Sequence, residues 1–374
     1  MAVKSSWYAS ELRRELGLRN RQWARGRAHV ESYGNPPVIV YSPRHPTDED
    51  LSVGTPRQHP TDEIRAGDGG HGNFFDPAYA SIMARPEWMR RFDKIHTGQK
   101  SLPKAEPVSG PARRWRELDS SMSSDALLMN VFCTPGVAEA AAVRQTLGAD
   151  GEAPPVFGWK ARVPLKNGRF DRTEVDMLWG SLLVEAKLTE GDFQSKSAAV
   201  VESYRDFDAV FDRELLPRVQ LATKRRREAA EFPEDYSQEF EEPVLETGGS
   251  SLTGAADLSA LLLDTAPFLA AADSGAEEAG YASYQLIRNV LAAYEQGCSF
   301  CVVHDERRPD LRESWFEVLT AVKSAEMRVR LKVLTWQELT AMLPEELQEF
   351  LDLKYGIVAP GRVASPLGGS EETE

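Results

Sequence analysis

Two carboxylates and a lysine lie close together in segment 173–188, TEVDMLWGSLLVEAKL. Successive side chains of a β-strand point to opposite faces of its sheet, so Glu185 and Lys187 share a face. A hairpin that turns at Gly180 can bring Asp176 to the same face from the neighbouring strand. Charged groups between apolar residues are costly unless they are paired or bind a metal ion. We therefore expect an ion-pair cluster or a metal site on this hairpin.

These residue types are suited to metal-assisted hydrolysis of a phosphodiester bond. Carboxylates bind Mg²⁺, which keeps several waters and accepts phosphate oxygens as further ligands. The metal activates a water and neutralises the charge that develops on phosphorus, and a lysine two residues after a carboxylate can hold that water. The alternative is a surface hairpin with a Glu–Lys–Asp salt-bridge ladder, which the spacing alone favours because short motifs recur by chance. The apolar run 182–184 before Glu185 is typical of a buried strand and favours the metal site.

The elements that must position this segment are predicted from hydrophobic periodicity. We predict strands at 156–164, 173–179, 182–188, 299–304 and 330–334. We predict helices at 8–28, 77–96, 115–132, 281–296, 313–324 and 336–355. The core order α-β-β-β-(insertion)-α-β-α-β-α predicts an α/β (α+β) fold, in which helices flank a mixed central β-sheet.

The charge of the chain is unevenly distributed. The 374 residues carry a net charge of −14, but residues 1–120 carry +4. An acidic chain repels nucleic acid overall, so DNA binding must rest on local basic patches and a site. We predict that the arginines of the first helix contact DNA phosphates. These arginines are Arg13, Arg14, Arg19, Arg21, Arg25 and Arg27.

Composition also predicts a division of the chain. We expect a helical and loop-rich N-terminal extension at 1–112, which includes a loop at 43–73, and a domain at 113–358 that contains the hairpin. Segment 189–280 carries a net charge of −12 and is predicted as an acidic insertion outside the core, with a solvated basic run at 224–227. Residues 359–374 are predicted as a disordered tail. The chain has no apolar run of membrane-spanning length, no apolar leader and three cysteines, and we expect a cytoplasmic protein that does not contact membranes.

The motif and the element order resemble the PD-(D/E)xK nuclease superfamily, in its restriction-endonuclease-like bacterial branch. Asp176 matches the first acidic residue of the motif, and Glu185 and Lys187 match its (D/E)xK, whereas Val175 stands where the motif has proline. Further segments typical of such proteins are HGNFFDPAYASIMARPEW at 71–88, SSDALLMNVF at 123–132, YQLIRNVLAAYEQG at 284–297 and LTWQEL at 334–339. The resemblance covers about residues 70–188 and 281–358.

The resemblance implies a DNA endonuclease of the restriction or defence type that depends on Mg²⁺ or Mn²⁺. It implies that Asp176 and Glu185 hold the metal, that the carbonyl of Ala186 adds a ligand and that Lys187 positions the water. Many superfamily members add an acidic residue from the first core helix. The candidates here are Glu117, Asp119 and Asp125, of which we favour Asp125.

Three weaker candidates flank the motif. Glu174 shares a face with Asp176, although a solvated edge charge is the simpler reading. On the helix after the insertion, Gln285 and Arg288 are expected to orient Lys187 or to contact a phosphate, and the resemblance to the superfamily, in which such helices often carry a functional glutamine, favours Gln285 as a supporting residue. A solvated helix face is the alternative for both residues.

Two other functions remain open. The acidic charge and the insertion are compatible with a nuclease-like module that binds DNA or protein with weak or no cleavage. A different metal-dependent phosphoesterase is the other alternative. The sequence leaves open DNA versus RNA and whether the chain forms a homodimer.

Overall fold

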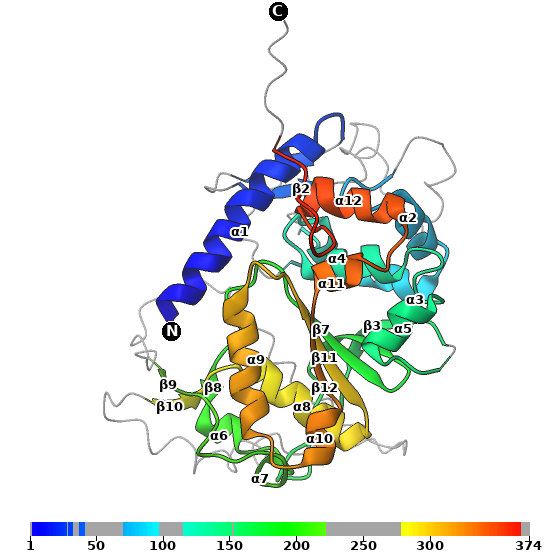
Figure 1. Cartoon of the computed structure of the whole chain (residues 1–374). Helices are drawn as coiled ribbons and strands as arrows, with labels where there is room; N and C mark the ends of the chain where they lie inside the picture. Colours follow the sequence, from blue (N-terminus) through cyan, green and yellow to red (C-terminus); the bar gives the residue numbers. More distant parts are fainter. Residues whose placement is uncertain are drawn as a thin grey trace, which may run out of the picture.

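The fold is built on a five-stranded mixed sheet with the strand order β12-β11-β7-β6-β3 (Figure 1). The computed structural model describes residues 2–27, 29–32, 37–41, 70–96, 115–151, 153–221 and 278–367. Strands β3 (Val156–Lys160), β6 (Glu174–Trp179) and β7 (Leu182–Ala186) are antiparallel neighbours. Strands β11 (Ser299–His304) and β12 (Leu331–Thr335) extend the sheet in parallel with β7.

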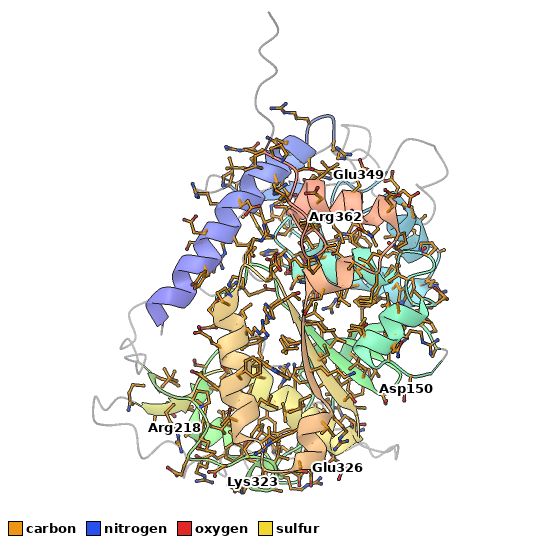
Figure 2. All side chains as sticks on the ribbon, in the orientation of Figure 1. Asp150, Arg218, Lys323, Glu326, Glu349 and Arg362 are labelled. Carbon is orange, nitrogen blue, oxygen red and sulfur yellow. The ribbon has the colours of Figure 1, made fainter. Side chains whose placement is uncertain are left out.

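The turn between β6 and β7 requires a glycine. Gly180 has a φ of +59°, and a Cβ there would overlap the backbone carbonyl of Asp150. The carboxylate of Asp150, which lies at the edge of the molecule in Figure 2, accepts hydrogen bonds from the backbone N–H and the hydroxyl of Ser181. The turn is therefore tied to the loop that precedes β3.

Helices cover both faces of the sheet (Figure 1). Helices α8 (Tyr284–Gln296) and α9 (Pro309–Ala321) pack on one face, where their apolar residues join Leu183, Phe300 and Val302 in one core cluster. The opposite face is covered by α4 (Ser124–Phe132), α5 (Ala141–Leu147), α11 (Trp336–Thr340) and α12 (Glu345–Tyr355). Helix α1 (Ala2–Trp23) packs against α12. The alternation of side chains along β7 and β11 thus divides the core into two layers.

Smaller elements surround this core. They are β1 (His29–Glu31), β2 (Ile39–Tyr41), α2 (Asp76–Met83), α3 (Pro86–Met89), η2 (Arg90–Asp93), η4 (Glu117–Asp119), β4 (Val163–Pro164), β5 (Phe170–Asp171), β8 (Lys196–Ser197), α6 (Ala198–Val201), α7 (Phe207–Val210), β9 (Arg218–Leu221), β10 (Glu278–Tyr281) and α10 (Ala325–Val329). None of the helices in the described ranges is long and apolar enough to span a membrane.

Several predicted elements differ from the structure, and the helix predicted at 336–355 is divided into α11 and α12. The helix predicted at 77–96 is broken, because Pro86 begins a new short helix and removes an N–H that a continuous helix needs. The strand predicted at 156–164 ends at Lys160, and β4 pairs with β5 in a separate sheet. Only 124–132 of the helix predicted at 115–132 is α-helical, and α5 was not predicted.

The first part of the predicted insertion belongs to the core. Phe193, Val201, Tyr204 and Phe207 are buried in the cluster that contains α8. The prediction that this segment lies outside the core is therefore wrong for residues 189–221. Its average charge was misleading, because these residues contribute only −3 of the −12. Residues 222–277, with the basic run 224–227, lie outside the described residues, as do 43–69 of the predicted loop.

The beginning of the predicted tail is held by specific contacts. The backbone N–H and the hydroxyl of Ser365 donate hydrogen bonds to the carboxylate of Asp352 in α12. The guanidinium of Arg19 in α1 donates to the carbonyl of Ser365 at 3.1 Å. Disorder was thus the wrong prediction for this part of 359–374, while residues 368–374 lie outside the described residues.

Candidate active site

Strands β6 and β7 separate just where the acidic motif begins. Their ladder runs from Trp179 and Leu182 to Met177 and Val184. Beyond it, the N–H of Ala186 donates to Oδ2 of Asp176 at 2.8 Å, so a side chain takes the place of a backbone partner. Asp176 therefore lies against the end of β7 that carries Glu185 and Lys187.

Helix α8 fixes the other two residues of the motif. The ammonium of Lys187 lies 2.9 Å from Oε1 of Glu185 and donates to Oε1 of Gln285 at 2.9 Å. The amide of Asn289, one helical turn after Gln285, donates to Oε2 of Glu185 at 2.8 Å. Since Glu185 and Lys187 are both almost fully buried, these hydrogen bonds hold each of them in one orientation.

The start of α8 is placed by the segment that we predicted as an insertion. The first N–H groups of a helix lack partners within the helix. Here the N–H groups of Tyr284 and Gln285 donate to the carbonyls of Gln194 and Phe193 at 2.9 Å. The ring of Phe193 also lies 5.5 Å from the ammonium of Lys187. Residues 193–194 therefore set the position of Gln285 relative to the motif.

Burial and charge act in opposite directions on Lys187. Burial lowers the pKa of its ammonium, but the carboxylates of Glu185, Glu190 and Asp176 outweigh burial and raise that pKa above its ordinary value. Lys187 is therefore protonated at neutral pH. It is suited to donate hydrogen bonds and to stabilise negative charge, and it is unsuited to accept a proton as a general base.

A second cluster of charges lies next to Asp176. Arg91 of η2 donates to Oδ2 of Asp125 at 2.8 Å and lies 2.6 Å from Oε1 of Glu174. Lys94, just after η2, contacts the same two carboxylates at 3.0 and 3.1 Å. Burial raises the pKa of Asp125, but Lys94 and Arg91 lower it by a larger amount. The pKa of Asp125 therefore lies below its ordinary value. Asp125 is thus an ionised carboxylate that already has two cationic partners.

The sequence analysis did not identify Arg91 and Lys94. Both lie in the segment that we predicted as one helix, and their spacing of three residues places them on one side of a helical turn. Arg91 is buried, which is rare for an arginine without a paired carboxylate. The sequence does not show which carboxylates would be those partners.

The other predicted residues fall into different roles. Arg288 is buried and donates to the carbonyl of Glu174 and to the side chain of Asn289. It therefore connects α8 to β6 beside the site. A solvated helix face is therefore the wrong alternative for Arg288. Asp119 accepts from Nε2 of His71 at 3.1 Å, on the side of the N-terminal segment. Glu117 remains near the cluster, where burial and then the charge of Asp125 raise its pKa to about 7.

Arg19 of the first helix has a structural role. It is buried, and its guanidinium donates to the carbonyls of Asp352 and Ser365. The prediction that it contacts DNA phosphates is therefore wrong. Leu12 and Leu16 of the same helix are buried in the core, so deleting the helix would disrupt the fold as well as remove its exposed arginines.

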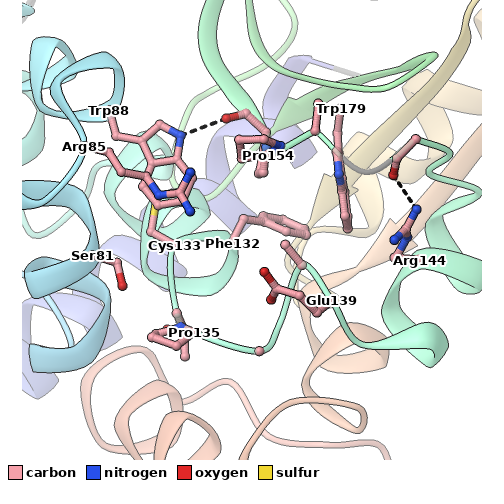
Figure 3. Close-up of a pocket in the computed structure, with 16 residues that line it drawn as sticks. Ser81, Arg85, Trp88, Phe132, Cys133, Pro135, Glu139, Arg144, Pro154 and Trp179 are labelled. Atoms are coloured by element: carbon pink, nitrogen blue, oxygen red, sulfur yellow. Dashed lines mark hydrogen bonds between the residues drawn. The ribbon is translucent and has the colours of Figure 1, made fainter.

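A separate pocket lies beside α3 and α4, with a volume of about 430 Å³ (Figure 3). Arg85, Trp88, Phe132 and Trp179 are among its lining residues, and the indole N–H of Trp88 donates to the carbonyl of Pro155. None of the predicted site residues lines this pocket. The candidate active site is therefore the charged cluster between β6, β7 and α8.

The comparison with protein families agrees with this fold. A family model described as restriction endonuclease associating with ARP matches residues 27–356, which is most of the chain. The chain belongs to this family. A search of curated proteins and a search of solved structures found no match. The predicted restriction-endonuclease-like family and fold are thereby confirmed, and the family supports a nuclease-type function.

Nucleases of the restriction-endonuclease-like group generally use divalent metals, and the residues at this site fit one such ion. The described residues contain no group of three or more His, Cys, Asp or Glu side chains arranged to bind a metal. Mg²⁺, however, needs only one or two carboxylates, because waters and substrate phosphate complete its shell. Burial, Glu185 and Asp125 raise the pKa of Asp176 well above its ordinary value. Burial and the neighbouring carboxylates thus disfavour the ionised form of Asp176, which a bound cation would stabilise.

The donor atoms are also suitable. Oδ2 of Asp176 accepts the N–H of Ala186, whereas no described residue donates a hydrogen bond to Oδ1. In an extended strand the N–H and the C=O of one residue point to the same side. The carbonyl of Ala186 is therefore directed toward β6, as its N–H is. Asp176, Glu185 and this carbonyl are the atoms that would hold the ion.

A glycine in β3 makes room for the second cluster of this restriction-endonuclease-family protein. Gly158 has a φ of +66°, and a Cβ there would overlap the guanidinium of Arg91. We expect Gly158→Ala to displace Arg91 from its two carboxylates and to lower the free energy of unfolding by roughly 1–3 kcal/mol, from overlap plus backbone strain. Urea denaturation measures this loss.

Gly168→Ala is the matched control. Gly168 has a φ of +80°, but no atom lies within 4 Å of the position of a Cβ. This substitution causes the backbone strain without the overlap. An equal loss of stability in both variants would show that the contact with Arg91 does not require the glycine.

Proposed function

We propose that this chain is a metal-dependent endonuclease that hydrolyses DNA phosphodiester bonds. The observation that carries the proposal is the hydrogen-bonded set of Glu185, Lys187, Gln285 and Asn289 beside the carboxylate of Asp176. Asp176 comes from β6, and Glu185 and Lys187 lie in and just after β7, where Gln285 and Asn289 of α8 hold them. A hairpin with a solvent-exposed salt-bridge ladder would not bury Glu185 and Lys187 in this way.

Each residue of the site has its own role in the proposed reaction. A bound divalent ion supplies Lewis-acid chemistry, by which a water loses a proton near neutral pH and phosphate charge is neutralised. The ammonium of Lys187 donates to the attacking water or to the phosphate oxygen that gains charge, and Gln285 keeps that ammonium directed to one place. Asn289 fixes one oxygen of Glu185, which limits the orientations of its carboxylate. Arg91 and Lys94 balance the charges of Asp125 and Glu174 beside the site.

A cleavage assay tests the proposal. We expect the protein to cleave plasmid or linear DNA with Mg²⁺ or Mn²⁺ and to lose this activity in EDTA. Substrates with and without methylation are needed, together with an RNA arm. Asp176→Asn protein purified in parallel controls for contaminating nucleases.

Two other results of the cleavage assay would contradict the proposal. If folded protein cleaves no DNA with either metal, the nuclease-like binding module becomes the better account. Cleavage of RNA alone would support metal-dependent phosphodiester hydrolysis with RNA, and not DNA, as the substrate.

A further inference from the structure

Lys94 has the position of a bridging cation. Its ammonium lies 3.0 Å from a carboxylate oxygen of Asp125 and 3.1 Å from one of Glu174. These carboxylates come from α4 and β6, which are far apart in the sequence. In two-metal phosphodiesterases the two ions lie about 3.5–4 Å apart, and carboxylates such as this pair are the ligands that a second ion would need.

Arg91 makes this position more strongly cationic. Its guanidinium contacts the same two carboxylates, and its place is prepared by Gly158, which leaves no side chain in its way. Two carboxylates therefore face two cations, and this part of the cluster is neutral. A divalent ion that entered here would have to displace an ammonium and lie beside a guanidinium, at a cost in charge repulsion.

The balance of charge is different at Asp176 and Glu185. Lys187 forms an ion pair with Glu185, whereas Asp176 accepts a backbone N–H from Ala186, so two carboxylates here face one ammonium. An ion is thus attracted to the motif and is excluded from the pair formed by Asp125 and Glu174. The sequence analysis favoured Asp125 as a further metal ligand, and its two cationic partners oppose that role.

We propose that the side chain of Lys94 occupies the place of a second metal ion, so that the chain binds one divalent ion, at Asp176 and Glu185. This inference rests on the proposed function. Lys94 is a positioning residue here, since it holds Asp125 and Glu174 beside the metal site. Its side chain is 34% exposed, so solvent and ions reach it.

Metal counting tests the inference without any cleavage assay. The probe is Mn²⁺ alone, titrated into the full chain, with the unbound ion followed by electron paramagnetic resonance. We expect one bound Mn²⁺ in the wild-type protein. Lys94→Met keeps the aliphatic stem and removes the charge, so two carboxylates then share only Arg91. We expect a second bound Mn²⁺ in this variant.

Three further variants test whether the second ion binds because the charge of Lys94 has been removed. Lys94→Arg keeps the positive charge, and we expect one ion. Lys94→Met combined with Glu174→Gln removes one of the two carboxylates, and the count should return to one. Arg90→Ala changes an exposed arginine of the same 3-10 helix, and we expect one ion. Circular dichroism and thermal melting check that each variant is folded.

The outcomes separate this inference from the proposed function. Two Mn²⁺ ions in the wild-type protein, a result that needs no variant to fold, would overturn the role of Lys94 and leave a metal-dependent nuclease in place. A single ion in folded Lys94→Met would overturn it as well. No bound ion in any variant would overturn both the inference and metal-dependent cleavage.

Discussion

Asp176→Asn is expected to abolish DNA cleavage while leaving the protein as stable as the wild type or more stable. The substitution removes a charged metal ligand, and we expect single-turnover cleavage to fall at least about 10³-fold, the upper end for loss of one preorganised charged group. An asparagine oxygen can still accept the N–H of Ala186, as Oδ2 of Asp176 does. The local backbone is therefore expected to keep its conformation.

The stability prediction follows from the pKa of Asp176. Burial and the charges of Glu185 and Asp125 raise this pKa in the folded protein above its ordinary value of about 3.9. The folded state then binds the proton more tightly than the unfolded state. Stability attributable to Asp176 accordingly increases as the pH falls through the raised pKa toward about 3.9, and it is lost as the pH rises again. An asparagine carries no such dependence.

Urea denaturation over a range of pH, beside calorimetry with Mn²⁺, measures both effects. We expect weaker metal binding and a flatter pH profile in Asp176→Asn than in the wild type. Asp208→Asn is the matched control, because Asp208 is exposed and its pKa is lowered mainly by a hydrogen bond from Arg213. That control should keep wild-type cleavage. If Asp176→Asn cleaved DNA at the wild-type rate, Asp176 would not be a metal ligand.

Lys187→Met is expected to slow the chemical step about 10²–10³-fold while metal still binds. The substitution removes a point charge that donates to the water or the phosphate, and this is the scale of losing one preorganised donor. The methionine fills most of the space of the lysine stem. Because the pKa of Lys187 is raised, the wild-type rate should show no inflection from its deprotonation near neutral pH.

The same variant should also be less stable. Glu185 would keep Asn289 as a partner but lose the ammonium that neutralises it. Breaking a buried ion pair on one side typically costs about 3–5 kcal/mol. Single-turnover kinetics, Mn²⁺ calorimetry and urea denaturation separate the three effects.

Lys323→Met is the control for this substitution, because Lys323 is exposed and its ammonium donates to the carbonyl of Asp208, away from the site. Its rate should equal the wild-type rate. A wild-type rate in folded Lys187→Met would reduce Lys187 to a salt-bridge partner. The nuclease proposal would then lose its most specific residue.

The local features of this protein followed from the periodicity of its amino-acid sequence. Alternation along 173–188 was enough to predict the hairpin, with its turn at Gly180, since a strand period of two residues is a local property of the chain. The buried strand Ser299–His304 was predicted with the bounds that it has. The helix over the motif was predicted to begin three residues too early, at 281 instead of Tyr284, because its start depends on carbonyls from residues 193–194.

The groups that meet from distant parts of the chain depend on how separate elements pack together. Asp125 is 31 residues from Lys94 along the chain, and Glu174 is 80 residues from it, so no periodic pattern relates them. The burial of residues 189–221 was hidden in the same way, because their apolar side chains follow no regular repeat and become a core only when α8 packs against them. A local pattern specifies the face on which a side chain lies, whereas the packing of separate elements specifies its partners. For that reason Asp176, Glu185 and Lys187 could be named from the sequence, and the cations around Asp125 could not.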